Sequence, residues 1–360
     1  MKIVFTGGGT GGHIYPILAV IREIENAEIY FIGPKTNYGF SDLKKQGVII
    51  KNISAGKIRK GEILKNIVDV IFKIPLGIIQ SIFLLKRIKP DLIFSKGGFG
   101  SFPVLFANRF FRYPLFLHES DSVLGKVTKI FAQEAKKIFV SFENTNIEKA
   151  VLVGNPIRKE ILNGTREKAT DIFNLSNEKP IVLILGGSQG AEKINELVLG
   201  VLPQLLKNFE IIHQCGEKNF KDANLLYKTI VEDKNLDKFY HLHAYLDEEQ
   251  MKHALAAAHV VVSRAGAATI FEIAACGKPS ILIPLPESAQ NHQAQNAYLY
   301  AKTGAATVME PQNPTPHMLY SNLMNVFSRP HYLKEMGKAA IEFARPEAGK
   351  KIAQEIIDIK

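Results

Sequence analysis

The sequence predicts an α/β protein built from two doubly wound domains, in each of which a parallel sheet is covered by helices on both faces. Three observations support this prediction. Apolar strand-like runs alternate with helical patterns along the whole chain. A strand, a glycine loop and a helix open the chain, and the same succession returns about 180 residues later. The length of 360 residues also suits a pair of domains.

The first domain is expected to open with a strand, the loop Gly7–Gly12 and a helix. Apolar residues at spacings of three and four form one face of this helix from Ile14 onward. A longer helical stretch is predicted from Ile63 to Ile88. Strands are predicted at Lys2–Thr6, Glu28–Ile32, Val48–Ile50, Asp91–Ser95, Leu115–His118, Lys137–Val140 and Val151–Val153.

A domain boundary is predicted near Gly154–Pro156, which has the composition of a hinge. We therefore assign residues 1–158 to the first domain and 159–346 to the second, while the last helix, 347–360, fits either domain. A helix is predicted to follow the second glycine loop through Leu205. Strands of the second domain are predicted at Pro180–Leu185, Glu210–His213, Phe239–Leu242, Val260–Ser263, Ser280–Ile283 and Ala305–Met309.

The composition favours a globular protein of a reducing compartment. Apolar residues make up 46% of the chain and charged residues 22%. Cys215 and Cys276 lack the spacing of a metal site or a disulfide framework. The chain enters a strand directly after Met1, so we expect no signal peptide.

Positive charge is concentrated in the first half of the chain. Residues 1–158 carry 23 Lys and Arg against 12 Asp and Glu, a net charge of +11, whereas residues 159–360 carry 22 against 23. Solubility is one explanation, and an anionic partner, either a membrane surface or a nucleic acid, is the other. The apolar run 67–85 contains Asp69 and Lys73. Because a charge in mid-bilayer costs about 2.5–3.5 kcal/mol, we expect helices that dock on an anionic bilayer without crossing it.

The stretch Val260–Glu272, followed by Gly277 and a further strand, forms a predicted βαβ unit. Its small-residue turn, with Ala267, Ala268 and Thr269 opening the helix, offers backbone N–H groups and a helix N-terminus to a phosphate. Glu272 lies five residues past Ala267, roughly 7.5 Å along the axis, which suits a carboxylate that binds a ribose. The amides of Gln290, Asn291, Gln293 and Asn296 suit a uracil and sugar hydroxyls.

The first glycine loop is similar to a dinucleotide fingerprint, a weak signal when it stands alone. The second strand ends without the acidic residue that holds an adenosine ribose, which argues against a nicotinamide oxidoreductase. His13 closes the loop at a helix start and is either a packing residue or a general base. His241 and His243 alternate on a predicted strand and are expected to be structural. No carboxylate pair or histidine cluster indicates a metal, and we expect no cofactor.

An ordered set of motifs spans nearly the whole chain and resembles the MurG family, the peptidoglycan N-acetylglucosaminyltransferases with the GT-B fold. The motifs are Gly8–His13, Gly97–Phe99, His118-Glu119, Gly154–Arg158, Gly186–Ala191, Ser263–Glu272, and His292-Gln293 with Asn296. The resemblance implies two domains with a cleft between them. It also implies transfer of N-acetylglucosamine from UDP-N-acetylglucosamine to lipid I, giving lipid II with inversion at the sugar carbon. This step serves peptidoglycan synthesis, cell shape and division.

The resemblance also implies roles for single residues. The first domain is expected to take the undecaprenyl-pyrophosphate-linked acceptor, with His13 at the cleft, and to lie peripherally on the cytoplasmic face of the bacterial membrane. No nucleic acid is then expected. Because His13 opens a helix that faces this cleft, we hypothesise that it is the base. Acceptor-side residues are Thr10, Gly11, Gly12, Gly97, Gly98 and Phe99. Donor-side residues in the second domain and at the junction are Arg158, Ser188, Gln189, Leu246, Ala267, Ala268, Thr269, Glu272 and Gln293.

Two residues depart from the family pattern. Phe99 stands where the family usually has Tyr, and Asp121 where it usually has Asn. Asp121 lacks the amide donor of a sugar contact and adds a negative charge, so a share in proton abstraction, together with Glu119, is a second hypothesis for it. Three other functions remain open: another GT-B transferase acting on a glycolipid, a UDP-sugar epimerase, and a nucleotide-binding module without catalysis.

Overall fold

A computed structural model describes residues 1–9, 11–36, 39–59, 61–143, 149–186, 192–286, 288, 291–310 and 314–359. The chain divides into two compact units. The first comprises residues 1–158 and 345–360, and the second residues 159–344. The final helix, which the sequence left open, is therefore part of the first unit.

The first unit contains a seven-stranded parallel sheet with the strand order β3-β2-β1-β4-β5-β6-β7. The strands are β1 (Lys2–Thr6), β2 (Glu28–Gly33), β3 (Ile49–Asn52), β4 (Leu92–Ser95), β5 (Leu115–Glu119), β6 (Lys137–Val140) and β7 (Ala150–Leu152). Along β1, Ile3 and Phe5 pack into the core on one face of the sheet and Val4 into the core on the other. This alternation explains why the strand is apolar throughout.

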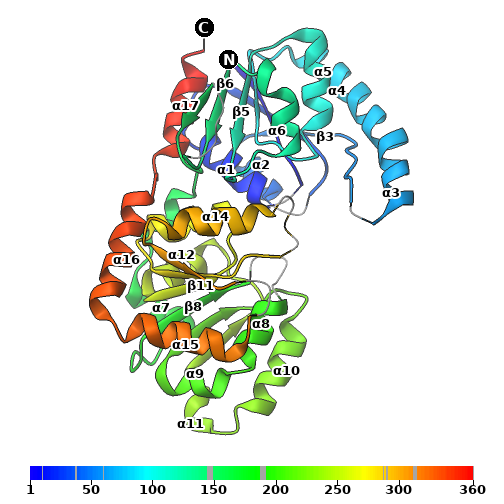
Figure 1. Cartoon of the computed structure of the whole chain (residues 1–360). Coiled ribbons are helices and arrows are strands. Elements are labelled where there is room, and N and C mark those ends of the chain that lie inside the picture. Colours follow the sequence, from blue (N-terminus) through cyan, green and yellow to red (C-terminus); the bar gives the residue numbers. More distant parts are fainter. Residues whose placement is uncertain are drawn as a thin grey trace. The chain divides into compact units, whose positions relative to one another are not determined.

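Helices cover both faces of the first sheet (Figure 1). The helical segments of this unit are α1 (Gly11–Ile21), α2 (Phe40–Lys45), α3 (Ile63–Val68), the π-helical η1 (Asp69–Lys73), α4 (Ile74–Ile88), α5 (Phe102–Phe111), α6 (Lys126–Phe131), the 3₁₀-helical η2 (Ala132–Glu134) and α17 (Ala348–Ile357). Helix α3 has no buried residue and does not cover the sheet. Helix α17 lies beside α1, and its Ile352 and Ile356 are fully buried with Ile17 in one core.

The second unit contains a six-stranded parallel sheet with the order β10-β9-β8-β11-β12-β13. Counted from the first strand of each unit, both sheets run third, second, first, fourth, fifth, sixth, and β7 adds a seventh strand to the first sheet. This order belongs to the doubly wound folds, the class predicted from the sequence. The strands are β8 (Ile181–Leu185), β9 (Glu210–Gln214), β10 (Tyr240–His243), β11 (Val260–Ser263), β12 (Ser280–Leu282) and β13 (Ala306–Val308).

The helices of the second unit again lie on both faces of its sheet (Figure 1). They are η3 (Lys159–Asn163), α7 (Arg166–Phe173), α8 (Glu192–Leu199), α9 (Leu202–Asn208), α10 (Phe220–Ile230), α11 (Lys234–Asp237), α12 (Glu248–Ala257), α13 (Ala267–Ala275), α14 (His292–Ala301), α15 (Pro316–Phe327) and α16 (Pro330–Phe343).

Two predicted helices differ from the observed ones. Helix α1 begins at Gly11, three residues before the predicted start at Ile14. The helix predicted through Leu205 is in fact two helices, α8 and α9, which are separated at Gly200. Pro203 has no N–H to continue α8 but is tolerated in the first turn of α9, which explains the break. A Cβ at Gly200 would lie 2.7 Å from Cγ of Pro316, so α15 packs closely on the same turn.

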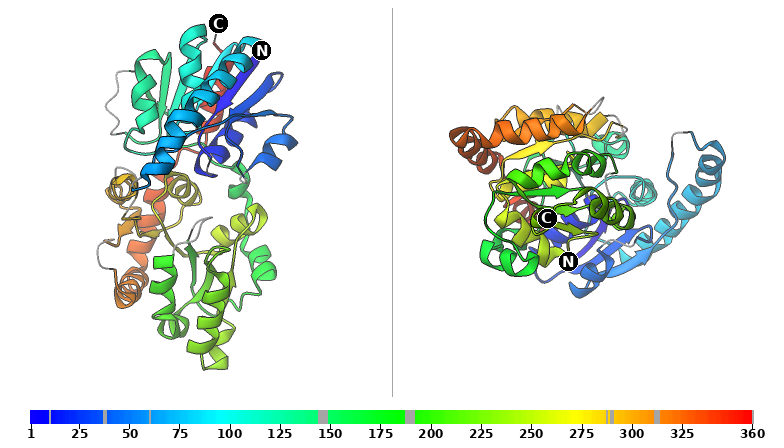
Figure 2. Two further views of the ribbon diagram at one scale, coloured as in Figure 1. Left: turned by 90° about the vertical axis from the view of Figure 1, so that its right-hand side faces the viewer. Right: turned by 90° about the horizontal axis from the view of Figure 1, so that it is seen from below.

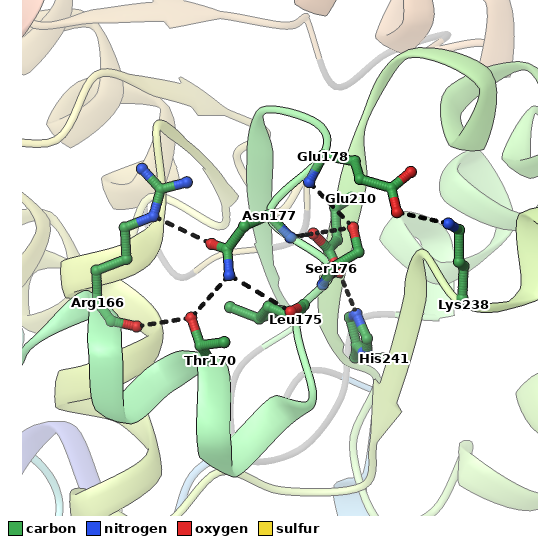
Figure 3. Close-up of polar contacts among 9 residues, drawn as sticks. All are labelled: Arg166, Thr170, Leu175, Ser176, Asn177, Glu178, Glu210, Lys238 and His241. Atoms are coloured by element: carbon green, nitrogen blue, oxygen red, sulfur yellow. Dashed lines mark hydrogen bonds and ion pairs between the residues drawn. The ribbon is translucent and has the colours of Figure 1, made fainter.

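A polar network lies at the amino ends of the strands of the second sheet (Figure 3). Glu210, the first residue of β9, is fully buried. Its carboxylate accepts hydrogen bonds from the N–H groups of Ser176 and Asn177, at 2.7 and 3.2 Å, and from Nε2 of His241 at 2.9 Å. Burial opposes the charge, but the bonds from His241 and Ser176 outweigh it and hold the pKa of Glu210 below its usual value. His241 therefore has a structural role.

We expect Glu210→Ala to destabilise the second unit by about 3–5 kcal/mol, because several buried donors lose their acceptor. Glu178→Ala is the matched control, since Glu178 forms an exposed ion pair with Lys238 that is worth less than about 1 kcal/mol. Urea unfolding followed by circular dichroism measures both. A depressed carboxylate pKa adds stability above its unfolded value of about 4.3, so the difference between wild type and Glu210→Ala should shrink as the pH falls below about 4. Equal midpoints for the two variants at pH 7 would refute this role.

Candidate active site

Three loops of the first unit meet at the carboxyl ends of neighbouring strands. Residues 7–9 follow β1, residues 96–101 follow β4, and residues 120–125 follow β5. Strand β1 pairs with β4, and β4 pairs with β5. The strand order reverses between β1 and β4, which is where open α/β sheets bind ligands.

His13 lies between two of these loops. A Cβ at Gly8 would be 3.1 Å from Cε1 and Nδ1 of the His13 ring, and a Cβ at Gly98 would be 2.9 Å from its Nε2. Gly98 also has a φ of +77°, which disfavours other residues. Glycine is thus required at both positions because the imidazole occupies the space that a side chain would need.

The imidazole of His13 is kept neutral by its surroundings. Burial, followed by the charge of Lys96, lowers the pKa of His13 to about 4, while Asp121 opposes this shift. A neutral imidazole has a lone pair that can accept a proton. Its depressed pKa weakens it as a base, so the groups that set this pKa also set what His13 can do.

Lys96 is buried next to this site, and the sequence analysis did not single it out. Its Nζ lies 2.7 Å from Nδ1 of His118 and 3.3 Å from Oδ1 of Asn155, and it also bonds the hydroxyl of Ser120. Burial lowers the pKa of Lys96 to about 7, although Glu119 and Asp121 oppose the shift. A lysine after a strand ordinarily points into water, so no sequence signal distinguishes this one.

The two acidic candidates, Glu119 at the end of β5 and Asp121 in the loop that follows, have different surroundings. Glu119 is buried, and its Oε2 accepts a hydrogen bond of 2.8 Å from the N–H of Gly125, so the carboxylate holds the loop. Burial raises the pKa of Glu119. Asp121 is half-buried and acts on His13 and Lys96 through its charge. Asp121 is thus the more accessible of the two carboxylates.

The other acceptor-side candidates of the first unit are also at this edge. Phe99 lies against Gly9, where a Cβ would be 3.7 Å from Cζ of the ring. Gly11 opens α1 and Gly12 is exposed, while Gly97 has a φ of +75°. The guanidinium of Arg158, a donor-side candidate, lies 5.0 Å from the ring of Tyr15 on α1. Thr10 lies outside the described residues.

The corresponding edge of the second unit lies between β8 and β11, where that strand order reverses. Helix α13 follows β11 directly, with Gly266 as its N-cap. Gly266 has no side chain that could cap this end, and the N–H groups of Ala267, Ala268 and Thr269 lie in the first turn, where they have no partner inside the helix. Ala268, Thr269 and Glu272 are partly exposed on α13, as the binding hypothesis requires.

The side-chain amides of Gln293 and Asn296 on α14 form hydrogen bonds with backbone groups of nearby loops, which the sequence analysis did not expect. Oε1 of Gln293 accepts a bond of 3.0 Å from the N–H of Leu285. Asn296 is fully buried and donates to the carbonyl of Ala265 at 3.2 Å, so its predicted contact with the ligand is wrong: it positions the β11–α13 turn. Leu246 is buried, and its N–H donates to Gln214 at 3.3 Å. Ser188, Gln189 and Gln290 lie outside the described residues.

Comparison with known proteins agrees with this arrangement. Residues 3–140 match the glycosyltransferase family 28 N-terminal domain, and residues 181–355 match the C-terminal domain of the same family. A Bacillus cereus protein named UDP-N-acetylglucosamine–N-acetylmuramyl-(pentapeptide) pyrophosphoryl-undecaprenol N-acetylglucosamine transferase 2 is 38% identical over 94% of this chain and 92% of its own. A Lachnospira eligens transferase named for the same reaction is 36% identical over 94% of each chain.

Solved structures give the same result for the fold. MurG of Acinetobacter baumannii matches 99% of both chains with a TM-score of 0.76 at 25% identity. A UDP-GlcNAc 2-epimerase of Neisseria meningitidis matches 99% of this chain and 100% of its own with a TM-score of 0.68, but at 14% identity this likeness concerns the fold alone. The chain therefore has the predicted GT-B fold and belongs to the MurG family of N-acetylglucosaminyltransferases.

Proposed function

We propose that the protein transfers N-acetylglucosamine from UDP-N-acetylglucosamine to the 4-hydroxyl of the muramoyl-pentapeptide of lipid I. The product is lipid II, formed with inversion at the anomeric carbon. The observation that carries this proposal is the 38% identity, over 94% of the chain, to a transferase named for this reaction. In each sheet the strand order reverses once, and ligands of such folds bind at the carboxyl ends of the strands there. We assign one of these two positions to the donor and the other to the lipid-linked acceptor.

The donor belongs at the N-terminus of α13. Its uncapped N–H groups and its helix dipole stabilise the negative charge that the diphosphate gains as it leaves. Glu272 is partly exposed one turn further along, and in this proposal its carboxylate accepts hydrogen bonds from the ribose hydroxyls. Arg158, Ser188, Gln189, Leu246 and Gln293 complete the donor side in this proposal. The end of α13 supplies positive charge for the leaving diphosphate without a metal.

The acceptor belongs at the glycine loops of the first unit, where His13 is the proposed base. Its neutral imidazole takes the proton of the 4-hydroxyl while that oxygen bonds to the anomeric carbon. The bond from the anomeric carbon to the UDP oxygen breaks, and its electron pair leaves on the diphosphate. Asp121 stabilises the imidazolium through its charge.

The reaction is tested by incubating labelled UDP-N-acetylglucosamine with a lipid I analogue. We expect a lipid-linked disaccharide, and we expect His13→Ala to lower its rate about 10²–10⁴-fold, the usual contribution of a general base. UDP affinity of the variant should be unchanged. Conversion of the sugar nucleotide to an epimer without a lipid product would contradict the transferase function, and full activity of His13→Ala would contradict the base.

The donor site is tested with Glu272→Ala. Losing a charge-assisted hydrogen bond costs about 1.5–3 kcal/mol, so we expect UDP-N-acetylglucosamine affinity to fall roughly 10- to 150-fold in calorimetry. Glu232→Ala removes an exposed carboxylate of the same unit, away from the strand edge, and serves as the control. Equal affinities for the two variants would rule out the ribose contact.

The segment Ile63–Ile88, which comprises α3, η1 and α4, is the proposed membrane contact, and it extends beyond the first sheet (Figure 2). By length and composition it is apolar enough to cross a membrane. One side of α4 is instead packed on its own unit, since a Cβ at Gly77 would lie 1.9 Å from the carbonyl oxygen of Ser54. The other side leaves an apolar face in water: Ile63, Leu64, Ile67, Val68, Val70, Ile71, Phe72, Leu76, Ile79 and Phe83.

Charges around this face favour docking over insertion. Asp69 is buried within η1, and its carboxylate accepts from Lys73 at 2.5 Å, from the N–H of Lys57 at 2.9 Å and from Arg59 at 2.9 Å. These bonds hold the pKa of Asp69 well below its usual range, so it stays ionised. An ion-paired carboxylate inside the segment is costly in mid-bilayer, whereas lysines beside an apolar face suit an anionic surface. These charges support our proposal that the protein lies peripherally on the cytoplasmic face of the membrane.

Vesicle sedimentation tests this contact. Phe72→Glu with Phe83→Glu should reduce binding to phosphatidylglycerol vesicles at least about tenfold, because burial of one Phe is worth about 1.5–3 kcal/mol. These rings are 65% and 70% exposed, and Leu225, which is 71% exposed on the second unit, gives the control Leu225→Glu. Equal loss of binding in the control, or none in the double variant, would exclude this face.

A further inference from the structure

Lys96 has surroundings that are unusual for a lysine. It follows β4, is only 3% exposed, and its side chain ends among acceptors from two other segments. His118 comes from β5, Ser120 from the loop after β5, and Asn155 from the segment after β7. Burial of a lysine costs folding free energy, so packing alone does not explain a lysine at this position.

The hydrogen bonds assign the protonation states in this cluster. Nε2 of His118 lies 3.0 Å from the carbonyl oxygen of Gly154, which can only accept, so Nε2 carries the proton and Nδ1 accepts from Lys96. The hydroxyl of Ser120 donates onward to Oδ1 of Asn155 at 3.1 Å. Lys96 therefore faces three acceptors, which match the three N–H bonds of an ammonium group.

Ionisable groups face Lys96 from two elements besides its own. The end of β5 and its loop contribute His118, Glu119 and Asp121, and α1 contributes His13. The side chains of His13 and Lys96 run on either side of Gly7, since a Cβ placed there would be 3.5 Å from the Cβ of each. Lys96 is thus close enough to His13 to act on it through its charge, and it is too deeply buried to be screened by water.

We propose that Lys96 is a positioning residue whose charge sets the base strength of His13. As an ammonium it opposes a second positive charge on the imidazole. As an amine it leaves Asp121 to stabilise the imidazolium unopposed. The inference rests on the proposed role of His13 and adds the group that controls it.

The directions of the shifts agree with this geometry. Burial lowers the pKa of Lys96 to about 7, and burial with the charge of Lys96 lowers the pKa of His13 to about 4. Below about pH 7 Lys96 is charged and His13 is a poor base. Above that pH Lys96 is neutral, and the pKa of His13 rises. The rate should therefore increase with pH through an apparent pKa near 7 that belongs to Lys96, not to His13.

Two substitutions of Lys96 test this proposal, one that removes its positive charge and one that keeps it at every pH. Lys96→Met removes the charge at every pH, so the acid limb of the kcat profile should move to lower pH. Lys96→Arg keeps the charge at every pH, so kcat should stay at the low level of the acid limb and lose the increase near pH 7. Lys51→Met, which removes an exposed charge from the same unit, should leave the profile unchanged. A purely structural role would lower kcat in both Lys96 variants without moving the limb, and that result would overturn the inference.

Histidine NMR tests the coupling without the reaction. In the wild type the His13 ring signal should show a step near pH 7 from Lys96 in addition to its own titration near pH 4. This measurement needs no variant to fold. In Lys96→Met the pKa of His13 should rise, and an unchanged value would overturn the inference. If the pKa moves but His13→Ala retains full activity, the base assignment fails and Lys96 loses its proposed role with it.

Discussion

The reversal of strand order in each sheet is the constraint on which both candidate sites depend. It falls between β1 and β4 in the first unit and between β8 and β11 in the second. Right-handed crossovers send the connecting helices to opposite faces on the two sides of such a reversal, so the carboxyl ends of these strands stay uncovered. Helices α1 and α13 begin at these edges, and the positive end of a helix dipole favours anionic ligands there.

The first unit brings its three loops together by close backbone packing. Gly8 and Gly98 leave room for the ring of His13, and Lys96 lies across Gly7 from it, with Nζ held by the neutral acceptors His118 and Asn155. Neutral acceptors solvate a buried cation without cancelling its charge, so its field reaches the neighbouring imidazole. Base strength at this site is therefore a property of the cluster, not of His13 alone.

Much of the fold could be predicted from the sequence, because strand and helix periods alternate clearly and both glycine loops follow apolar strands. The start of α1 at Gly11 could not, since glycines carry no apolar period. Pro203, in the first turn of α9, was a sequence signal for the break after α8 that the apolar period alone does not reveal. The motifs correctly placed His13 and Glu272 on helices that follow the carboxyl ends of strands. Lys96 was missed because its burial depends on Asn155, 59 residues away. The predicted ligand contact of Asn296 was wrong because its partner is the backbone carbonyl of Ala265, and a sequence motif does not reveal such a partner.

The account is tested most directly by a crystal structure of the protein with bound UDP-N-acetylglucosamine. It predicts that the diphosphate lies at the N-terminus of α13 and that Glu272 contacts the ribose. A nucleotide bound instead at the glycine loop after β1 would contradict the division of roles between the two sheets.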